Sequence, residues 1–321
     1  MKAITRTKYG MPDVLLLDAD AAKPEPTADG LVVRVDAASV NRFDWYDITG
    51  RPWIARPMTG LRGPKSLPVG GDFAGTVEAV GEDVTDLEAG NEVFGIAGGS
   101  FAEYALVRKA VALKPTNVSF EEVAAVPTAG LTALQALRDH GRFQPGQSVL
   151  VNGASGGVGT FALQIAKALG AEVTAVCSTG NVAQASALGA DQVIDYTRED
   201  FTNGGRRYDL MVDIAGSKSW RRCRRVLTSD ARLVIVGGEG SALMGPLGHI
   251  AGTWLASRPG KRAVTFFVAD LNRSDLEYLG ELLVSGQVKP VIEKRYELAD
   301  VPEAIRYMGR GHARGKLVIT V

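Results

Sequence analysis

The chain has 321 residues, with 36 Lys and Arg against 36 Asp and Glu, and 45% of the residues are hydrophobic. This length can bury two cores, and the composition is that of a soluble globular protein rather than a disordered or fibrous one. Because the net charge is zero, no overall field attracts nucleic acid, an anionic membrane or an acidic substrate, and we expect none of these as a partner.

The cysteines and the N-terminus indicate the compartment. Two cysteines, Cys177 and Cys223, are too few for a disulfide framework, and neither has a metal-binding spacing. The first residues alternate like a strand and lack the apolar core of a signal peptide, and no apolar run approaches the length of a membrane span. We therefore expect a cytoplasmic protein. The basic run 221–225 is expected to be a solvated helix face.

Residues 1–117 contain short strand patterns broken by Gly and Pro, for example over 31–37 and 75–81, and little helix. This pattern predicts an antiparallel, barrel-like domain. The segment 50–68 is rich in Pro, Gly and Arg and reads as a long surface loop. Long loops in compact domains are often functional.

From residue 118 helices alternate with short apolar strands, which predicts an α/β fold with a doubly wound parallel sheet over 118–268. The helices are expected over 121–139, 161–170, 182–189 and 218–227. The strands are expected over 148–151, 173–177, 192–195, 210–214, 233–236 and 264–268.

The remaining residues, 269–321, resemble neither the nucleotide domain nor a third core and are assigned back to the first domain. They are expected to form helix 274–285, strand 291–298, helix 301–309 and strand 316–321. The cleft between the two domains, 1–117 with 269–321 and 118–268, is the expected active site.

A glycine-rich turn follows the apolar strand 148–151 and opens the next helix. Glycines 153, 156 and 159 suit a tight turn, a close approach of backbone to a pyrophosphate, and close packing of helix on sheet. The helix N-terminus then presents its amides to the phosphates. A dinucleotide site is predicted, and a glycine loop without a ligand is the alternative.

The cofactor preference follows from the next strand end, residues 177–181, which contain no Asp or Glu. NAD sites of this fold usually carry an acid there to bind the ribose hydroxyls. A carboxylate would repel a 2′-phosphate, whereas Ser178 and Thr179 hydroxyls and open amides can donate hydrogen bonds to it. NADP(H) is therefore favoured by elimination.

Collinear motifs extend this interpretation to the whole chain. They are Ala-Ser-Val-Asn at 38–41, Gly-Gly-Asp-Phe-Ala-Gly at 70–75, Gly-Asn-Glu-Val-Phe-Gly at 90–95, Ala-Gly-Leu-Thr-Ala at 129–133, the glycine turn at 153–159 and Val-Ile-Asp-Tyr at 193–196. With them the chain resembles the medium-chain dehydrogenase/reductase superfamily, in its zinc-independent, zeta-crystallin-like NADPH:quinone oxidoreductase branch. The resemblance implies a GroES-like β-barrel catalytic domain and a Rossmann nucleotide-binding domain.

Zinc is excluded by residue type. Zinc-dependent relatives carry a Cys, a Gly-His-Glu motif and a second Cys at positions that match Asn41, Gly71 with Asp72, and Thr128. Three protein ligands cannot be assembled from these residues, so we expect no metal. Without a Lewis acid, alcohol oxidation is disfavoured. Hydride transfer to a quinone or to the β-carbon of an α,β-unsaturated carbonyl needs less help and is the expected reaction.

The resemblance also assigns site residues. The cofactor-binding set is Asn41, Thr132, Gly153, Ala154, Ser155, Gly156, Gly157, Val158, Gly159, Ser178, Thr179, Asn181, Tyr196, Ala215, Gly237, Gly238, Phe266, Val268 and Lys316. Many relatives carry Arg or Lys at the positions of Gly180 and Asn181, and this chain carries neither. Selectivity for NADP is then weaker, or the charge comes from elsewhere, with Lys316 as a candidate.

Tyr46 and Asn41 are the expected catalytic residues. Related quinone oxidoreductases have a Tyr at the position of Tyr46, pointing into the cleft, where a phenol can donate a hydrogen bond to a substrate carbonyl and a proton after hydride transfer. A packing role for Tyr46 is the alternative. Asn41 and Thr132 are expected to orient the nicotinamide end, or else to make only local hydrogen bonds.

Two other functions compete with this one. An NADPH-dependent enoyl-thioester reductase would need basic residues for the carrier phosphate, and Arg51, Arg56, Arg62 and Lys65 in the loop 50–68 could serve. A non-catalytic NADPH-binding or scaffold protein is the alternative of another class. The family also suggests a homodimer, with the apolar run 264–268 as a contact.

Overall fold

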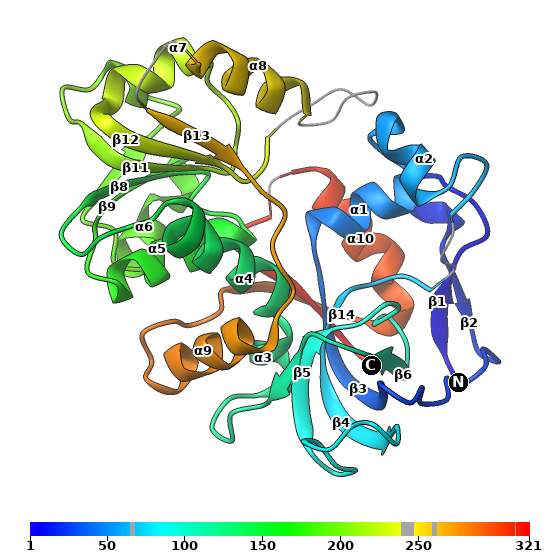
Figure 1. Ribbon diagram of the computed structural model, residues 1–321. Coiled ribbons are helices and arrows are strands. Elements are labelled where there is room, and N and C mark those ends of the chain that lie inside the picture. Colours follow the sequence, from blue (N-terminus) through cyan, green and yellow to red (C-terminus); the bar gives the residue numbers. More distant parts are fainter. Residues whose placement is uncertain (65–67, 239–246, 259–261, 312) are drawn as a thin grey trace. The chain divides into compact units, whose positions relative to one another are not determined.

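The computed structural model describes residues 1–64, 68–238, 247–258, 262–311 and 313–321. It divides into two compact units: unit 1 comprises Met1–Leu131 and Asp270–Val321, and unit 2 comprises Thr132–Ala269 (Figure 1). The helices are α1 Arg42–Thr49, α2 Arg56–Thr59, α3 Phe120–Ala124, α4 Pro127–Gln135, α5 Gly157–Ala168, α6 Val182–Ala187, α7 Trp220–Cys223, α8 Leu247–Ser257, α9 Arg273–Val284 and α10 Val301–Gly309. The strands are β1 Ala3–Thr5, β2 Leu16–Asp18, β3 Leu31–Val40, β4 Asp72–Val80, β5 Glu92–Ile96, β6 Tyr104–Val107, β7 Val111–Leu113, β8 Ser148–Asn152, β9 Glu172–Cys177, β10 Gln192–Asp195, β11 Tyr208–Asp213, β12 Leu227–Ile235, β13 Ala263–Phe266, β14 Ile292–Glu297 and β15 Lys316–Thr320.

Unit 1 is built around the long strand β3. The first half of β3 pairs with β6 and its second half with β15, while β4 runs along its other side, and all three pairings are antiparallel. The remaining strands extend the sheet in the order β14-β15-β3-β4-β5-β7. Because β3 changes partner along its length, the sheet encloses a core that includes Val33, Phe73 and Leu317. The predicted antiparallel domain is confirmed.

The C-terminal segment belongs to unit 1 because β15 pairs with β3 over Ala37–Val40. Helix α3 also packs on unit 1, against β3, β4, β5 and β15. Residues 118–131 therefore lie with unit 1, although the sequence pattern placed them at the start of the nucleotide domain.

Unit 2 contains a six-stranded sheet in the order β10-β9-β8-β11-β12-β13, and all of its pairings are parallel. Numbered from β8, this is the order 3-2-1-4-5-6 of a dinucleotide-binding fold. Helices α5 and α6 lie on one face of the sheet and α7 and α8 on the other (Figure 1). The predicted doubly wound sheet is confirmed. In this fold ligands bind outside the carboxyl ends of the strands, where the strand order reverses between β8 and β11.

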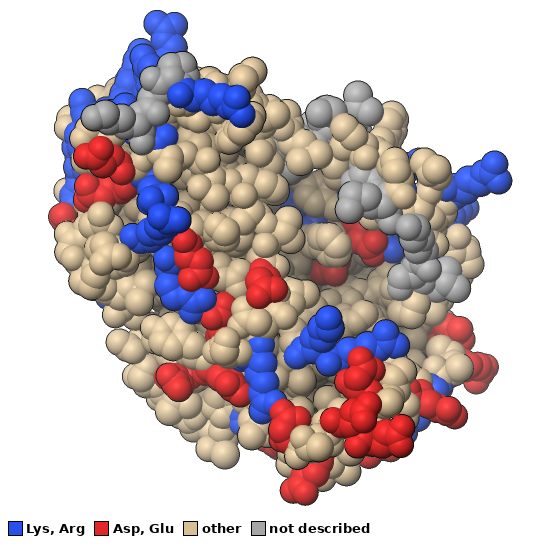
Figure 2. All heavy atoms as spheres, viewed as in Figure 1, with Lys and Arg blue, Asp and Glu red and all other residues tan. Residues whose placement is uncertain are grey.

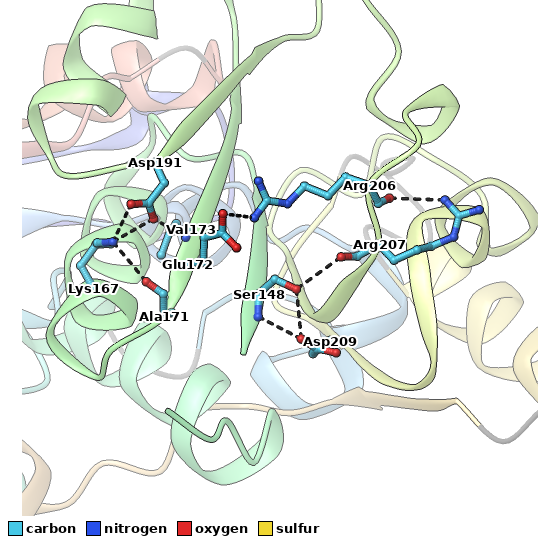
Figure 3. A network of polar contacts seen from close by, with 9 residues as sticks. All are labelled: Ser148, Lys167, Ala171, Glu172, Val173, Asp191, Arg206, Arg207 and Asp209. Atoms are coloured by element: carbon cyan, nitrogen blue, oxygen red, sulfur yellow. Dashed lines mark hydrogen bonds and ion pairs between the residues drawn. The ribbon is translucent and has the colours of Figure 1, made fainter. Parts of the chain in front are cut away.

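Ion pairs and hydrogen bonds cover the opposite, amino-terminal ends of these strands (Figure 3). Ser148 donates from its backbone N and its Oγ to Asp209 Oδ2, at 2.9 and 3.0 Å. Arg206 pairs with Glu172, and Lys167 Nζ lies 2.8 Å from both carboxylate oxygens of Asp191. Such partly exposed pairs contribute little to stability, so we interpret this network as a solvated end of the sheet.

Element lengths differ from the sequence pattern at three places. The helix expected over 121–139 is interrupted, because α3 ends at Ala124 and Pro127 opens α4, whose last residues continue as a π-helical turn to His140. The helix expected over 218–227 is only the single turn α7 followed by a 3₁₀ turn. Strand β12 begins at Leu227, six residues before the predicted start.

The surface carries both signs of charge on the face drawn in Figure 2, consistent with a net charge of zero. Among the residues that the structure describes, no helix is both long and apolar enough to span a membrane.

Candidate nucleotide and substrate site

The glycine turn joins β8 to α5 at the carboxyl end of the parallel sheet. Gly153 has φ +94°, a left-handed conformation that favours glycine. A Cβ on Gly159 would lie 2.2 Å from the carbonyl oxygen of Gly153, so only glycine lets α5 approach the turn this closely. The backbone amides of Gly153 and Ala154 both donate to the carbonyl of Val176 in β9, at 3.2 and 3.1 Å. The turn is therefore fixed against the neighbouring strand.

Gly156 has a different role from its two neighbours. It precedes the first turn of α5 with extended backbone, and a Cβ built on it would meet nothing within 4 Å. Packing therefore does not require a glycine here. Open space at a helix N-terminus is what a pyrophosphate needs, because the first amides of the helix have no partners within it. Ser155, Gly157 and Val158 are half-buried around this opening, and Ala154 is buried.

The ends of β9 and β10 form the expected adenosine edge of this site. Asn181 is buried, and its Nδ2 donates to Ser178 Oγ at 3.1 Å, whereas its Oδ1 has no partner among the described residues. Thr179 Oγ1 donates to Asp195 Oδ2 at 2.5 Å. The Tyr196 side chain is 55% exposed, with its backbone N bonded to the carbonyl of Cys177. The sequence-predicted residues of this edge therefore lie together, with Asp195 added to them.

The ends of β11 and β12 form the other side of the strand-order reversal. Asp213 is fully buried, and its Oδ1 accepts from Asn152 Nδ2 at 2.7 Å and from the backbone N of Gly216 at 3.0 Å. The Ala215 amide donates to the carbonyl of Asn152, which holds this loop beside the glycine turn. His249 Nε2 lies 3.5 Å from Asp213 Oδ2.

Five further residues of the predicted cofactor set belong to unit 2. Gly237 and Gly238 follow β12, and a Cβ on Gly216 would lie 2.6 Å from Gly238 Cα, so these two loops are in contact. Phe266 ends β13 and Val268 follows it, and both side chains are exposed. Thr132 is half-buried in α4, at the start of unit 2.

Asn41, Asp72 and Thr128 occupy the positions at which zinc-dependent relatives carry metal ligands. In unit 1 these residues lie together, around the buried carboxylate of Asp72. Asp72 accepts from Ser39 Oγ at 3.0 Å, from Asn41 Nδ2 at 2.8 Å and from Thr128 Oγ1 at 2.5 Å. Lys316 Nζ lies 3.2 Å from Asp72 Oδ2 and donates to Asn41 Oδ1 at 2.5 Å. We call these five residues the Asp72 cluster.

The Asp72 cluster does not fit a zinc ion. Zinc sites in proteins use Cys, His and carboxylate ligands, and Asp72 is the one such group in the cluster. Its two oxygens are already engaged by hydrogen-bond donors and by the ammonium of Lys316. Within the described residues, no group of three His, Cys, Asp or Glu side chains is placed to hold a metal.

The sequence suggested Lys316 as a contact for a 2′-phosphate, but the residue is buried inside unit 1. The residue is 1% exposed, and its ammonium is bound to Asn41 and Asp72 inside unit 1. A buried ammonium paired in this way has no surface to offer a phosphate. The basic charge at the adenosine edge has to come from another side chain.

Asp44 lies next to the Asp72 cluster. Its Oδ2 accepts from the backbone N of Asn41 at 2.6 Å, which caps α1. Burial raises the pKa of Asp44 to about 7, outweighing the lowering by this hydrogen bond. The negative charge of Asp72 raises the pKa further, and the ammonium of Lys316 lowers it. Unit 1 thus contains a carboxyl group that changes its charge near neutral pH.

Tyr46 lies in α1, half-buried against the core of unit 1, with the Arg42 guanidinium carbon 5.5 Å from its ring centroid. Its hydroxyl has no hydrogen-bond partner among the residues that the structure describes. The side chain of Asn41, by contrast, is committed to the Asp72 cluster, with one amide N–H bonded to Asp72 and the carbonyl oxygen bonded to Lys316.

Sequence reasoning missed two features of these sites. It did not connect Lys316 with Asp72, because they are 244 residues apart and are brought together by strand pairing. It also overlooked the carboxylate of Asp195 beside Thr179, although 173–177 and 192–195 were predicted as consecutive strands of one parallel sheet, which was a usable signal. Of the loop 50–68, Lys65 lies outside the described residues.

Comparisons with known proteins agree with this arrangement. A family model described as "Alcohol dehydrogenase GroES-like domain" matches residues 27–117, and one described as "Zinc-binding dehydrogenase" matches residues 188–319. The chain is 35% identical to the 2-methylene-furan-3-one reductase of Solanum lycopersicum, over 99% of this chain and 79% of that protein.

Solved structures give the same picture. The quinone oxidoreductase of Coxiella burnetii superposes with a TM-score of 0.89 at 32% identity, covering 100% of this chain and 99% of that one. The Escherichia coli quinone oxidoreductase, solved in complex with NADPH, has a TM-score of 0.85 at 26% identity and covers 100% of both chains.

Proposed function

Since the chain belongs to the zinc-independent quinone oxidoreductase branch of the medium-chain dehydrogenase/reductase family, we propose that it transfers a hydride from NADPH to a quinone or an α,β-unsaturated carbonyl compound. The observation that carries this proposal is the glycine turn, closed tightly at Gly159 and open at Gly156, at the strand-order reversal of a parallel sheet. NADPH, when bound, supplies the hydride.

The residues of unit 2 bind and orient the cofactor. The amides at the start of α5 would hold the pyrophosphate, and the open space at Gly156 would leave room for it. Asn181 Oδ1, buried without a partner in the described part of the chain, is an acceptor for a hydroxyl or amino group at the adenosine edge. Gly237 and Gly238 leave the carboxyl end of β12 without side chains, which suits the flat nicotinamide end.

In unit 1, Tyr46 stabilises the negative charge that forms on the acceptor oxygen. Its phenol is without a partner among the described residues, so it is available to donate a hydrogen bond to a carbonyl, and a positioned donor of this kind lowers the barrier. After hydride transfer it can pass a proton to the same oxygen. Asn41 supports this arrangement as a positioning residue, because it links the start of α1 to Asp72 and Lys316.

The test is oxidation of NADPH and NADH, followed by nicotinamide absorbance, with a quinone, a simple enone, crotonyl-CoA and an aldehyde. Turnover of the quinone or enone, with none of the aldehyde, is expected. Tyr46→Phe should lower kcat by about tenfold or more while NADPH affinity stays unchanged, and Tyr104→Phe in β6 is the matched control. If Tyr46→Phe keeps full activity, the phenol has only a packing role.

The two competing functions are outcomes of the same panel. Preference for crotonyl-CoA would favour an enoyl-thioester reductase, and Arg51 and Arg62 in the loop are exposed enough to contact a carrier phosphate. Arg56 is less available, since its Nε donates to the carbonyl of Gly50 at 3.1 Å. Tight NADPH binding without turnover of any acceptor would favour a binding or scaffold protein.

A homodimer and a cytoplasmic location complete the proposal. Strand β13 is the edge of the parallel sheet, with Phe266 exposed beside a cavity of about 310 Å³ that is lined by Trp254 and Ile250, among others. An apolar edge strand is a ready surface for pairing with a second copy. Thr265→Pro should produce monomers in sedimentation experiments if β13 forms that contact, and an unchanged mass would contradict it.

A further inference from the structure

We infer that Arg198 supplies the positive charge that binds the 2′-phosphate of NADPH, and that Asp195 holds it in place and sets how strongly NADPH is preferred over NADH. This inference rests on the proposed function, because it names a specificity-determining residue for the same cofactor site. At the end of the second strand, neither Gly180 nor Asn181 provides a basic side chain for this phosphate.

Asp195 introduces an acid at the adenosine edge, where the second strand itself has none. It ends β10 and is the register partner of Cys177, which ends β9. Its Oδ2 accepts from Thr179 Oγ1 at 2.5 Å, and its Oδ1 accepts from the backbone N and the Oγ1 of Thr197, at 3.0 and 2.7 Å. These contacts hold the side chain, which is 13% exposed, against the loop that follows β9.

The hydrogen bond from Thr179 to Asp195 limits the hydrogen bonds that Ser178 and Thr179 can donate to a phosphate. The hydroxyl proton of Thr179 is donated to Asp195 and is no longer available for a ligand. Ser178 keeps its own proton, since its Oγ accepts from Asn181. One neutral hydroxyl beside a carboxylate is a poor site for a phosphate dianion, because the like charges repel. A cation is needed here for NADPH to bind well.

Arg198 is the cation that the structure places on this carboxylate. Its Nε lies 3.5 Å from Asp195 Oδ2, and its side chain is 77% exposed. No other side-chain partner of Arg198 lies within the described ranges. A guanidinium has five N–H donors in a planar fork, so pairing through Nε leaves the terminal amino groups for a phosphate. Asp195 thereby orients the guanidinium instead of excluding the phosphate.

The test compares equilibrium affinities, measured by nicotinamide fluorescence, for NADPH and NADH in wild type and in Arg198→Ala. We expect Arg198→Ala to weaken NADPH about tenfold and to leave NADH unchanged, which corresponds to losing one charged hydrogen bond. Arg206→Ala is the matched control. Arg206 also pairs with an acid, Glu172, in the same unit, but at the amino-terminal ends of the strands (Figure 3).

A second variant and a fragment test sharpen the result. Asp195→Asn removes the carboxylate that orients the Arg198 guanidinium and should weaken NADPH several-fold relative to NADH, whereas tighter NADPH binding would contradict this orienting role. Calorimetry with adenosine 2′,5′-bisphosphate and adenosine 5′-phosphate should show the same loss in Arg198→Ala without the nicotinamide present. An unchanged NADPH-to-NADH affinity ratio in Arg198→Ala would overturn the inference and leave the proposed function intact. Failure of the wild type to bind either nucleotide would instead refute the proposed function.

Discussion

Replacing Lys316 by Met tests whether the Asp72 cluster holds unit 1 together. The substitution keeps the volume and most of the aliphatic stem of the side chain, and removes an ammonium that lies 3.2 Å from Asp72 Oδ2 and 2.5 Å from Asn41 Oδ1. Asp72 is fully buried, so its carboxylate cannot replace the lost partner with bulk water. Breaking a buried pair from one side leaves an uncompensated charge.

The magnitude follows from what remains around that charge. Two charges 3.2 Å apart attract by about 5 kcal/mol at an effective dielectric constant of about 20. Measured losses for a broken buried pair are about 3–5 kcal/mol. Asp72 retains hydrogen-bond donors from Ser39, Asn41 and Thr128, which replace part of the lost interaction. We therefore expect the free energy of unfolding of unit 1 to fall by about 3 kcal/mol, toward the lower end of that range.

The assay is urea unfolding of the wild type, Lys316→Met, Asp72→Asn and the double variant. Because the two single changes remove the same pair, the double variant should lose much less than the sum, with a coupling energy above about 1 kcal/mol. Lys23→Met is the control, since Lys23 pairs with Glu78 on the surface and its loss should leave the urea midpoint nearly unchanged. Lys316→Met matching that control, or strictly additive costs, would refute the reasoning.

The remaining predictions use other parts of the molecule. Gly156→Ala should weaken NADPH binding without lowering the melting temperature, because a methyl group there meets no protein atom. Gly159→Ala should lower the free energy of unfolding by about 2 kcal/mol, because its methyl group would clash with the turn. Equal effects of both variants on stability would contradict the binding role of Gly156 and the packing role of Gly159. Asp44 has a folded-state pKa raised above its unfolded value. Its contribution to the free energy of unfolding is therefore fully present below about pH 4 and is lost as pH rises through 7. Asp44→Asn should therefore gain about 2–3 kcal/mol relative to wild type between pH 5 and pH 8 in urea titrations, and parallel pH curves would show that Asp44 does not titrate there. Burial raises the pKa of Cys177 and raises that of Cys223 to about 12, so the native protein should show no fast thiol with Ellman's reagent at pH 8, against two thiols in urea.

Much of unit 2 could be predicted from the sequence because its signals are local. The glycine turn at 153–159, the apolar strands on either side of it and the helical periodicity after it all lie within about thirty residues, the size of one βαβ unit. The ends of helices were less predictable. Pro127 separates α3 from α4 where the apolar pattern runs on without a break, because the pattern reports burial and not backbone continuity.

Residue type and short spacing were sufficient to predict the fold class, the position of the glycine turn and the unsuitability of Asn41, Gly71 and Thr128 as zinc ligands. Only the tertiary structure shows which charged and polar side chains lie next to one another. Lys316 reaches Asp72 because β15 returns to pair with β3, so a residue considered for the cofactor is buried inside unit 1 instead. Asp195 reaches Thr179 because β10 lies beside β9. Electrostatic partners depend on distance in space, and strand pairing sets that distance across separations at which no local sequence pattern exists.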